Sequence, residues 1–220
     1  MEPMELHDLL DASRYMDEIE SARITSENRL RSLMQAGAGE STPTVRGLQK
    51  GVDALNDVEH QAILSMSRTF RLTPFSAWQK SHKGVGEKQA ARLIGVIGDP
   101  YIATPMRRDE NGVTVEAMAP RPRTISQLWA YCGYSVTNGA ARRRRKGVQS
   151  NWKAEARTRA YLISTSCIKV MDGEYRSVYD QGRAKYSELS DGHAHNRSLR
   201  LVSKEILRDL WLVARDYHEK

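Results

Sequence analysis

Apolar residues recur at helical spacing along most of this chain. Between residues 3 and 34, leucine and isoleucine side chains return every three to four positions, which predicts one or two helices. The same spacing predicts a long amphipathic helix over residues 44–70, which Thr73-Pro74 ends. Further helices are predicted over residues 75–81, 87–97, 126–132, 152–170, 175–189 (broken or kinked at Gly182) and 198–218. We therefore expect a mainly α fold.

Two stretches interrupt the helical pattern. Asn111-Gly112 is typical of a two-residue type I′ turn, and the residues behind it alternate between apolar and polar. A small β-hairpin is therefore predicted between residues 101 and 122. Residues 35–43 contain two glycines and a proline among small residues, which is typical of a linker. The chain then divides into an N-terminal helical extension and linker, residues 1–42, and a larger helical domain, residues 43–220.

A glycine-bracketed turn joins two of the predicted helices. Gly84 and Gly86 enclose Val85, and glycine reaches positive φ without a clash at Cβ, so the chain can reverse tightly there. The reversal leaves the first amides of the next helix uncovered at the positive end of the helix dipole, which suits a phosphate oxygen. Lys83 and Lys88 flank the turn and add positive charge. The pattern is typical of a helix-hairpin-helix that grips nucleic-acid backbone, although such turns also occur between packed helices that bind nothing.

The charge of the chain points to an acidic partner. The 220 residues include 34 Lys and Arg against 27 Asp and Glu, a formal surplus of seven positive charges. The first 30 residues lean acidic, so the surplus concentrates in the middle of the chain, and the early acidic residues are interpreted as a solvated helix face. No apolar run approaches membrane-spanning length, and the acidic start does not resemble a signal peptide. We expect a cytoplasmic, nucleoid-associated protein that does not enter a membrane.

Five consecutive positive charges, Arg142-Arg143-Arg144-Arg145-Lys146, form the densest basic segment. Adjacent residues on a helix point in different directions and these would repel one another, so the run is interpreted as a loop that orders against a polyanion. The alternatives are a solvated loop or a nuclear import sequence. Four aromatic residues lie on either side of the run, where they either stack on unpaired bases or pack in the core: Trp129, Tyr131, Tyr134 and Trp152.

Several segments together resemble one family. They are Pro74-Phe75 with Trp78, residues 84–89, 97–101 and 127–134, Asn151-Trp152, residues 175–180, residues 200–202 and Leu210-Trp211. Over roughly residues 55–218 the chain is similar to the C-terminal half of the insertion-sequence transposases that pair a RuvC-like domain with a serine-bearing domain, some of which are guided by a bridge RNA. The resemblance implies a helical domain whose helix-hairpin-helix holds DNA.

Two departures from that family bear on chemistry. The family's four RuvC-like carboxylates precede this region on a sheet, and here only about 70 mostly helical residues precede it. Where the family carries its nucleophilic serine followed by glycine, this chain has Asn138-Gly139, and asparagine cannot form a covalent phosphoserine link. Ser135, Thr137 or Ser150 would replace the nucleophile only in a shifted loop.

No other constellation predicts an enzyme or a metal site. The two cysteines, Cys132 and Cys167, form no metal-ligand pair and fit a reducing compartment. Asp191-Gly192-His193-Ala194-His195 holds a carboxylate and two imidazoles, but it is interpreted as a turn before the last helix, with its histidines hydrogen-bonded or facing phosphate. We therefore predict no catalytic residues, no metal and no cofactor.

These observations predict a non-enzymatic DNA-binding protein, a phage or mobile-element accessory or regulatory factor that contacts the backbone largely independently of sequence. RNA is the alternative ligand. The alternative functions are a truncated transposase component that works with a separate catalytic chain, and a helical protein that binds another protein's acidic face. The N-terminal helices predict pairing with a second copy or a partner protein. The predicted DNA contacts are Lys83, Gly84, Val85, Gly86, Lys88, Arg107, Arg108, Arg121, Arg123, Arg142, Arg143, Arg144, Arg145 and Lys146.

Overall fold

The computed structural model describes residues 4–108, 114–137, 139–144 and 146–220. Within these ranges the chain is mainly helical, as predicted, with short antiparallel strand pairs. The helices are α1 (His7–Gln35), α2 (Pro43–Arg71), α3 (Phe75–Ser81), α4 (Glu87–Ile97), α5 (Ile125–Tyr131), α6 (Ala154–Lys169), α7 (Glu174–Lys185) and α8 (Asp191–His218). The strands are β1 (Ile102–Ala103), β2 (Met106–Arg108), β3 (Thr114–Ala117), β4 (Arg121–Pro122), β5 (Val136–Thr137) and β6 (Ala140–Ala141).

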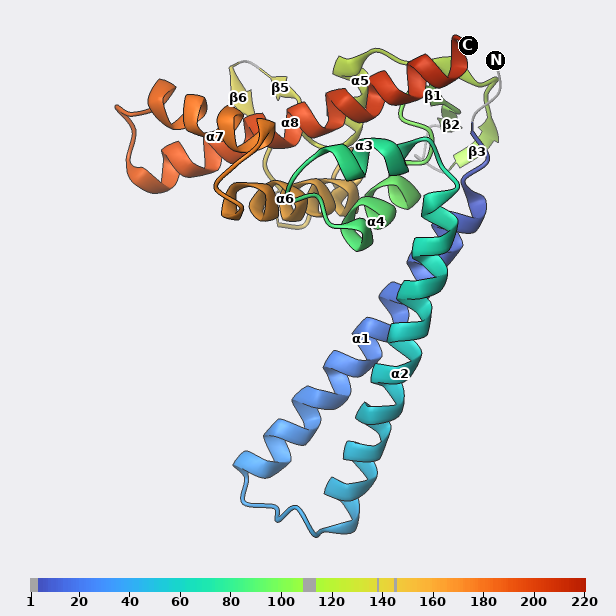
Figure 1. Cartoon of the computed structure of the whole chain (residues 1–220), viewed down its shortest axis with the longest axis vertical. Helices are drawn as coiled ribbons and strands as arrows, with labels where there is room; N and C mark the ends of the chain where they lie inside the picture. The colour runs from blue at the N-terminus through green and yellow to red at the C-terminus, as the bar shows by residue number, and fades with distance from the viewer. Residues whose placement is uncertain (1–3, 109–113, 138, 145) are drawn as a thin grey trace.

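Helices α1 and α2 form an antiparallel hairpin, here called the arm, which projects from a body made of residues 72–220 (Figure 1). The arm has a seven-residue repeat on each helix, which is the pattern of a coiled coil. Buried positions recur at Leu9, Met16 and Leu30 on α1, and at Val45, Val52, Glu59 and Met66 on α2. The boundary predicted at residue 42 lies at the tip of this hairpin, next to the first residue of α2.

Helix α8 is the centre of the body. It packs against α3, α5, α6 and α7, and its buried stripe includes Leu199, Val202, Ile206 and Leu210. Helix α4 is the part of the body that joins it to the arm, because it packs against both α1 and α6, and all of its residues from Ala90 to Ile97 are buried. The core is therefore continuous from the base of the arm through α4 to α8.

The predicted β-hairpin is present. Strands β2 and β3 pair antiparallel, with Met106 opposite Ala117, and β1 pairs with β4, with Ile102 opposite Pro122. The predicted turn residues Asn111-Gly112 lie outside the described residues. A further pair, β5 and β6, precedes the basic run and was not predicted.

Three expectations about the helices were wrong. Asp191 begins α8 and does not belong to a preceding turn, and α7 ends at Lys185 without a break at Gly182. Gly182 instead allows α7 to approach α8, since a Cβ there would lie 2.8 Å from the Ser198 hydroxyl. The acidic residues of α1 are not all solvated, because Asp17 and Glu20 form ion pairs with the body.

Candidate nucleic-acid interface

The glycine turn has the predicted connection but is packed on one side. Gly84 has φ +83°, and a Cβ at this position would lie 2.7 Å from the Cα of Cys167 in α6. Val85 is 4% exposed, and its carbonyl accepts a hydrogen bond from the Gln79 side chain at 2.7 Å. Gly86, the N-cap of α4, is exposed and has open space around it. The inner half of the turn is thus a packing contact, and only its outer half faces solvent.

The two turn lysines are already paired with carboxylates. Lys83 forms an exposed ion pair with Asp172. The Lys88 ammonium lies 3.0 Å from Glu20 and 3.2 Å from Glu59, so it is directed toward the arm. Glu87, in the first turn of α4, is held by Arg71 at 2.7 Å. Carboxylates therefore occupy much of the surroundings in which the sequence predicted a phosphate.

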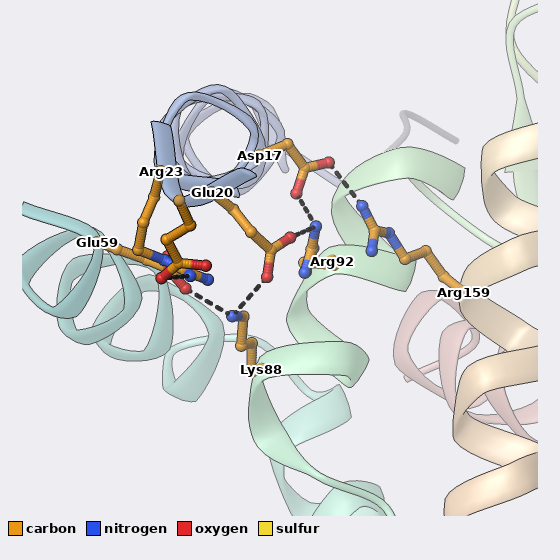
Figure 2. Close-up of polar contacts among 8 residues, drawn as sticks. Asp17, Glu20, Arg23, Glu59, Lys88, Arg92 and Arg159 are labelled. Carbon is orange, nitrogen blue, oxygen red and sulfur yellow. Dashed lines mark hydrogen bonds and ion pairs between the residues drawn. The ribbon is translucent and has the colours of Figure 1, made fainter. Parts of the chain in front are cut away.

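Lys88 belongs to a charge network that fastens the arm to the body (Figure 2). Asp17 pairs with Arg92 of α4 and with Arg159 of α6, which lies 2.8 Å away. Arg92 is 2% exposed and pairs with Glu20 as well, at 2.7 Å. Burial raises the pKa of Glu20, but hydrogen bonds from Arg92 and Lys88 outweigh it, so the pKa lies below its ordinary value.

The β-hairpin arginines have different surroundings. Arg123 is 9% exposed, and its guanidinium donates to the carbonyls of Pro100 and Asp99, so it ties the end of β4 to the α4–β1 connection. Burial lowers its pKa. Arg121 is exposed on β4. Arg107 and Arg108 lie on β2.

The basic run leaves the β5–β6 pair as a loop, as predicted for residues without a helical face. Arg143, Arg144 and Lys146 are exposed, and Arg145 lies outside the described residues. The loop is attached to α6 through its first residue, because the Arg142 carbonyl accepts a hydrogen bond from Arg157 at 3.2 Å.

Arg157 connects the loop to a row of cations on α8. The guanidinium groups of Arg157 and Arg200 lie over the same Tyr134 ring, 5.8 Å and 5.5 Å from its centroid. Arg200 also donates to the carbonyl oxygens of Tyr134 and Ser135. Both guanidinium groups are thereby fixed against the same ring in the segment that follows α5.

The row extends in both directions along α8. The Lys204 ammonium lies 3.7 Å from the centroid of Trp129, within the range of a strong cation–π contact. Arg197 lies 5.4 Å from the centroid of Tyr186, and Lys185 lies 5.8 Å from the same centroid. We call the surface formed by the loop and this row the cationic surface: Arg143, Arg144, Lys146, Arg157, Lys185, Arg197, Arg200 and Lys204.

The cationic surface gathers cations without carboxylate partners. Within the described ranges, none of its eight members forms an ion pair with a carboxylate, whereas half of the Lys and Arg residues of α1, α2 and α4 do: Arg14, Arg23, Arg71, Lys88 and Arg92. Burial and then the nearby charge of Arg157 lower the pKa of Arg200. Burial and then Arg200 lower the pKa of Lys204. Positive charges are therefore held close together without compensation, an arrangement that an anionic ligand would relieve.

The cationic surface and the glycine turn lie on opposite sides of α8. Arg200 and Asp209 are nine residues apart, which is two and a half turns of helix, so their side chains leave α8 in opposite directions. Asp209 accepts a hydrogen bond from Tyr175 at 2.8 Å, and the Tyr175 ring stacks on His82, which begins the turn. The predicted contacts thus do not form one continuous surface.

The aromatic residues near the run are used inside the protein. Tyr134 is buried, and Trp129 donates its indole N–H to the Lys204 carbonyl at 3.0 Å. Trp152 packs on Gly133, where a Cβ would lie 2.5 Å from the indole ring. Their faces carry cations or packed chain, so packing accounts for these three rings.

Sequence reasoning missed the α8 half of the cationic surface. Its members were separated from the basic run by about 50 residues, and only the fold brings them together. The spacing of Arg197, Arg200 and Lys204, three and then four residues apart, was the available indication, because it places all three on one helix face.

The remaining candidate residues do not assemble a catalytic or metal site among the described residues. The Ser135 hydroxyl is buried, and both cysteines are buried free thiols whose pKa values burial raises to about 12. His195 is hydrogen-bonded to the Tyr179 hydroxyl at 2.7 Å, as one reading of its segment predicted. No group of histidine, cysteine and carboxylate side chains in the described ranges is placed to hold a metal ion. No described helix combines the length and apolarity needed to span a bilayer.

Comparison with protein-family models, with curated proteins and with solved structures found no match in any of the three. The resemblance to the C-terminal half of the transposases stays an expectation drawn from the residues quoted above.

Proposed function

We propose that the protein binds DNA through its cationic surface, by contacts to phosphate that are largely independent of base sequence. One observation carries the proposal: eight cations from three helices, and from a loop attached to one of them, have no ion-pairing carboxylate among the described residues. A fixed excess of like charge weakens folding unless a ligand supplies the opposite charge.

The chemistry of the surface favours phosphate over bases. Arginine forms paired hydrogen bonds with phosphate oxygens, and the exposed loop residues Arg143 and Arg144 are free to reach them. Of the four rings beside the run, Tyr134 is buried, a cation lies over Trp129 and Trp152 packs on Gly133, so Tyr131 is the one exposed ring on which a base could stack. A backbone-contacting, non-enzymatic role is therefore the function that this geometry supports best.

The test is DNA binding across a salt series with the triple variant Arg143→Ala/Arg144→Ala/Lys146→Ala. Each lost phosphate contact lowers the slope of log affinity against log salt by about 0.9 for duplex DNA, so we expect the slope to fall by about two to three. Affinity at physiological salt should fall at least about tenfold. The double variant Lys185→Gln/Arg197→Gln should lower both quantities in the same direction.

A matched control removes the same charge from the arm. Arg29, Arg31 and Lys50 are exposed near the arm tip, far from the body (Figure 1), and their triple alanine variant should leave affinity nearly unchanged. If both triple variants lost the same DNA affinity, the effect would depend on net charge alone and would contradict the proposal. Parallel measurements with single-stranded DNA and structured RNA identify the preferred ligand. If the protein bound only RNA tightly, RNA would replace DNA as the proposed ligand.

A further inference from the structure

On one side of the arm each helix carries a stripe of uncharged residues, which on α2 runs over about five helical turns. On α2 the exposed residues Gly47, Gly51, Ala54, Val58, Gln61 and Ser65 follow one another at spacings of three and four. On α1 the same spacings of three and four separate a stripe of exposed or half-buried residues: Ala12, Tyr15, Ile19, Ala22 and Ser26. We call these two stripes together the uncharged face. Within the charge network of Figure 2, Asp17 and Glu20 lie on the side of α1 that meets α4.

The two stripes belong to one surface because they enclose a common groove. A groove of about 400 Å³ is lined by Ala12 and Tyr15 from α1 and by Asp57, Val58, Gln61, Ala62 and Ser65 from α2. Tyr15 is 50% exposed and Val58 is 38% exposed. Apolar side chains thus stand around a hollow that no described part of the body covers.

We propose that the uncharged face packs against the same face of a second copy of this chain, so that two arms form a four-helix bundle. A two-fold interface requires that one surface carry both the projection and the recess that receives it. The uncharged face does so, since Tyr15 projects beside the groove. Asp57 in the groove offers an acceptor for a tyrosine hydroxyl that enters from the other copy.

The size of the face agrees with this occupant. A stripe of 19 residues along α2 spans about 27 Å, and two packed helices are about 20 Å wide, so each copy contributes on the order of 500 Å² and a pair covers about 1,000 Å². That is the lower bound for a specific protein–protein interface. Two uncharged stripes are also no partner for a polyanion or an acidic peptide, whereas pairing them with the same stripes of a second copy buries little charge, that of Asp57 in the groove.

The test is sedimentation of the nuclease-treated protein at about 1 M salt, where the Debye length is about 3 Å and bridging through nucleic acid is suppressed. We expect a dimer. Val58→Glu would place an unpaired carboxylate in the interface and should raise the dissociation constant at least about tenfold. Tyr15→Ser should weaken the dimer in the same direction by removing the projecting ring.

The matched control is His60→Glu, which adds a carboxylate at an exposed position on the other side of α2 and should leave the dimer intact. Circular dichroism of each variant should retain the wild-type helical signal, because all three positions lie on the surface of the arm. A monomeric wild-type protein, or a dimer that neither Val58→Glu nor Tyr15→Ser weakens, would overturn the proposal. This result is independent of DNA binding, which the cationic-surface variants test separately.

Discussion

Gly84 and Gly86 lie two residues apart in the same turn, and their surroundings differ. At Gly84 the backbone has φ +83° and α6 lies within contact distance, whereas at Gly86 φ is −74° and the space around the Cα is open. Glycine is thus required at Gly84 by both conformation and packing. At Gly86 neither conformation nor packing requires glycine. Backbone geometry therefore explains only the first of the two glycines in the Gly84-Val85-Gly86 turn.

This difference gives a prediction at the scale of single residues. Gly84→Ala should lower the free energy of unfolding by at least about 2 kcal/mol, because it combines a left-handed backbone with a Cβ placed against the Cα of Cys167. Gly86→Ala should change it by less than about 1 kcal/mol. Urea denaturation of the two variants measures both values, and equal stabilities would show that the turn is not packed as described.

At the scale of elements, the arm combines a coiled-coil repeat with a polar layer. Arg23 occupies the repeat position between Met16 and Leu30, and it pairs with Glu59, which occupies the equivalent position on α2. A polar pair at such a position fixes the register of two helices, because a shifted alignment would bury a charge against an apolar layer. Burial raises the pKa of Glu59, but hydrogen bonds from Arg23 and Lys88 bring it below its ordinary value.

The lowered pKa values of Glu20 and Glu59 predict how the arm responds to acid. A carboxylate whose pKa is lower in the folded state contributes stability above its unfolded pKa of about 4.3, and this contribution disappears as the pH falls through the folded value. The free energy of unfolding should therefore decrease as the pH is lowered beneath about 4.5. Glu59→Gln should lower stability at neutral pH by on the order of 3 kcal/mol and flatten that drop.

Urea denaturation between neutral and acidic pH measures the effect. Glu18→Gln is the control, because it removes the same charge from an exposed residue of α1, two positions from Glu20, that forms no ion pair within the described ranges. It should leave the pH profile unchanged. A Glu59→Gln profile that coincides with the wild type would mean that the network does not fasten the arm.

Local patterns were sufficient for the helices but not for the sites. Apolar spacing placed α1, α2, α4 and α6 to within a few residues, because each helix buries one stripe against the core. The start of α8 was missed because its first turn, which begins Asp191-Gly192-His193, has no apolar stripe of its own. The roles of Glu20 and Arg92 were missed because 72 residues separate the two partners, and only the fold makes them neighbours.

At the scale of the whole molecule, α8 separates two basic regions that the sequence suggested would act together. The cationic surface lies along one side of α8, and the glycine turn joins the His82–Tyr175–Asp209 cluster on the other. A straight duplex cannot contact both sides of a packed helix at once. If the uncharged faces pair, two cationic surfaces belong to one assembly, and two sites on one DNA molecule would bind far more tightly than either alone.

The last prediction separates the two basic regions by charge. Lys83→Met removes a lysine that Asp172 already neutralises in an exposed ion pair, so it should change DNA affinity less than about twofold and stability by less than about 1 kcal/mol. Asp172→Asn is the complementary variant, because it frees the Lys83 charge while raising the net charge of the protein. If DNA contacts only the cationic surface, this variant also leaves the salt slope unchanged. A slope that falls by about one in Lys83→Met and rises in Asp172→Asn would instead place a phosphate at the glycine turn, and the duplex would then have to bend around the body to reach both regions.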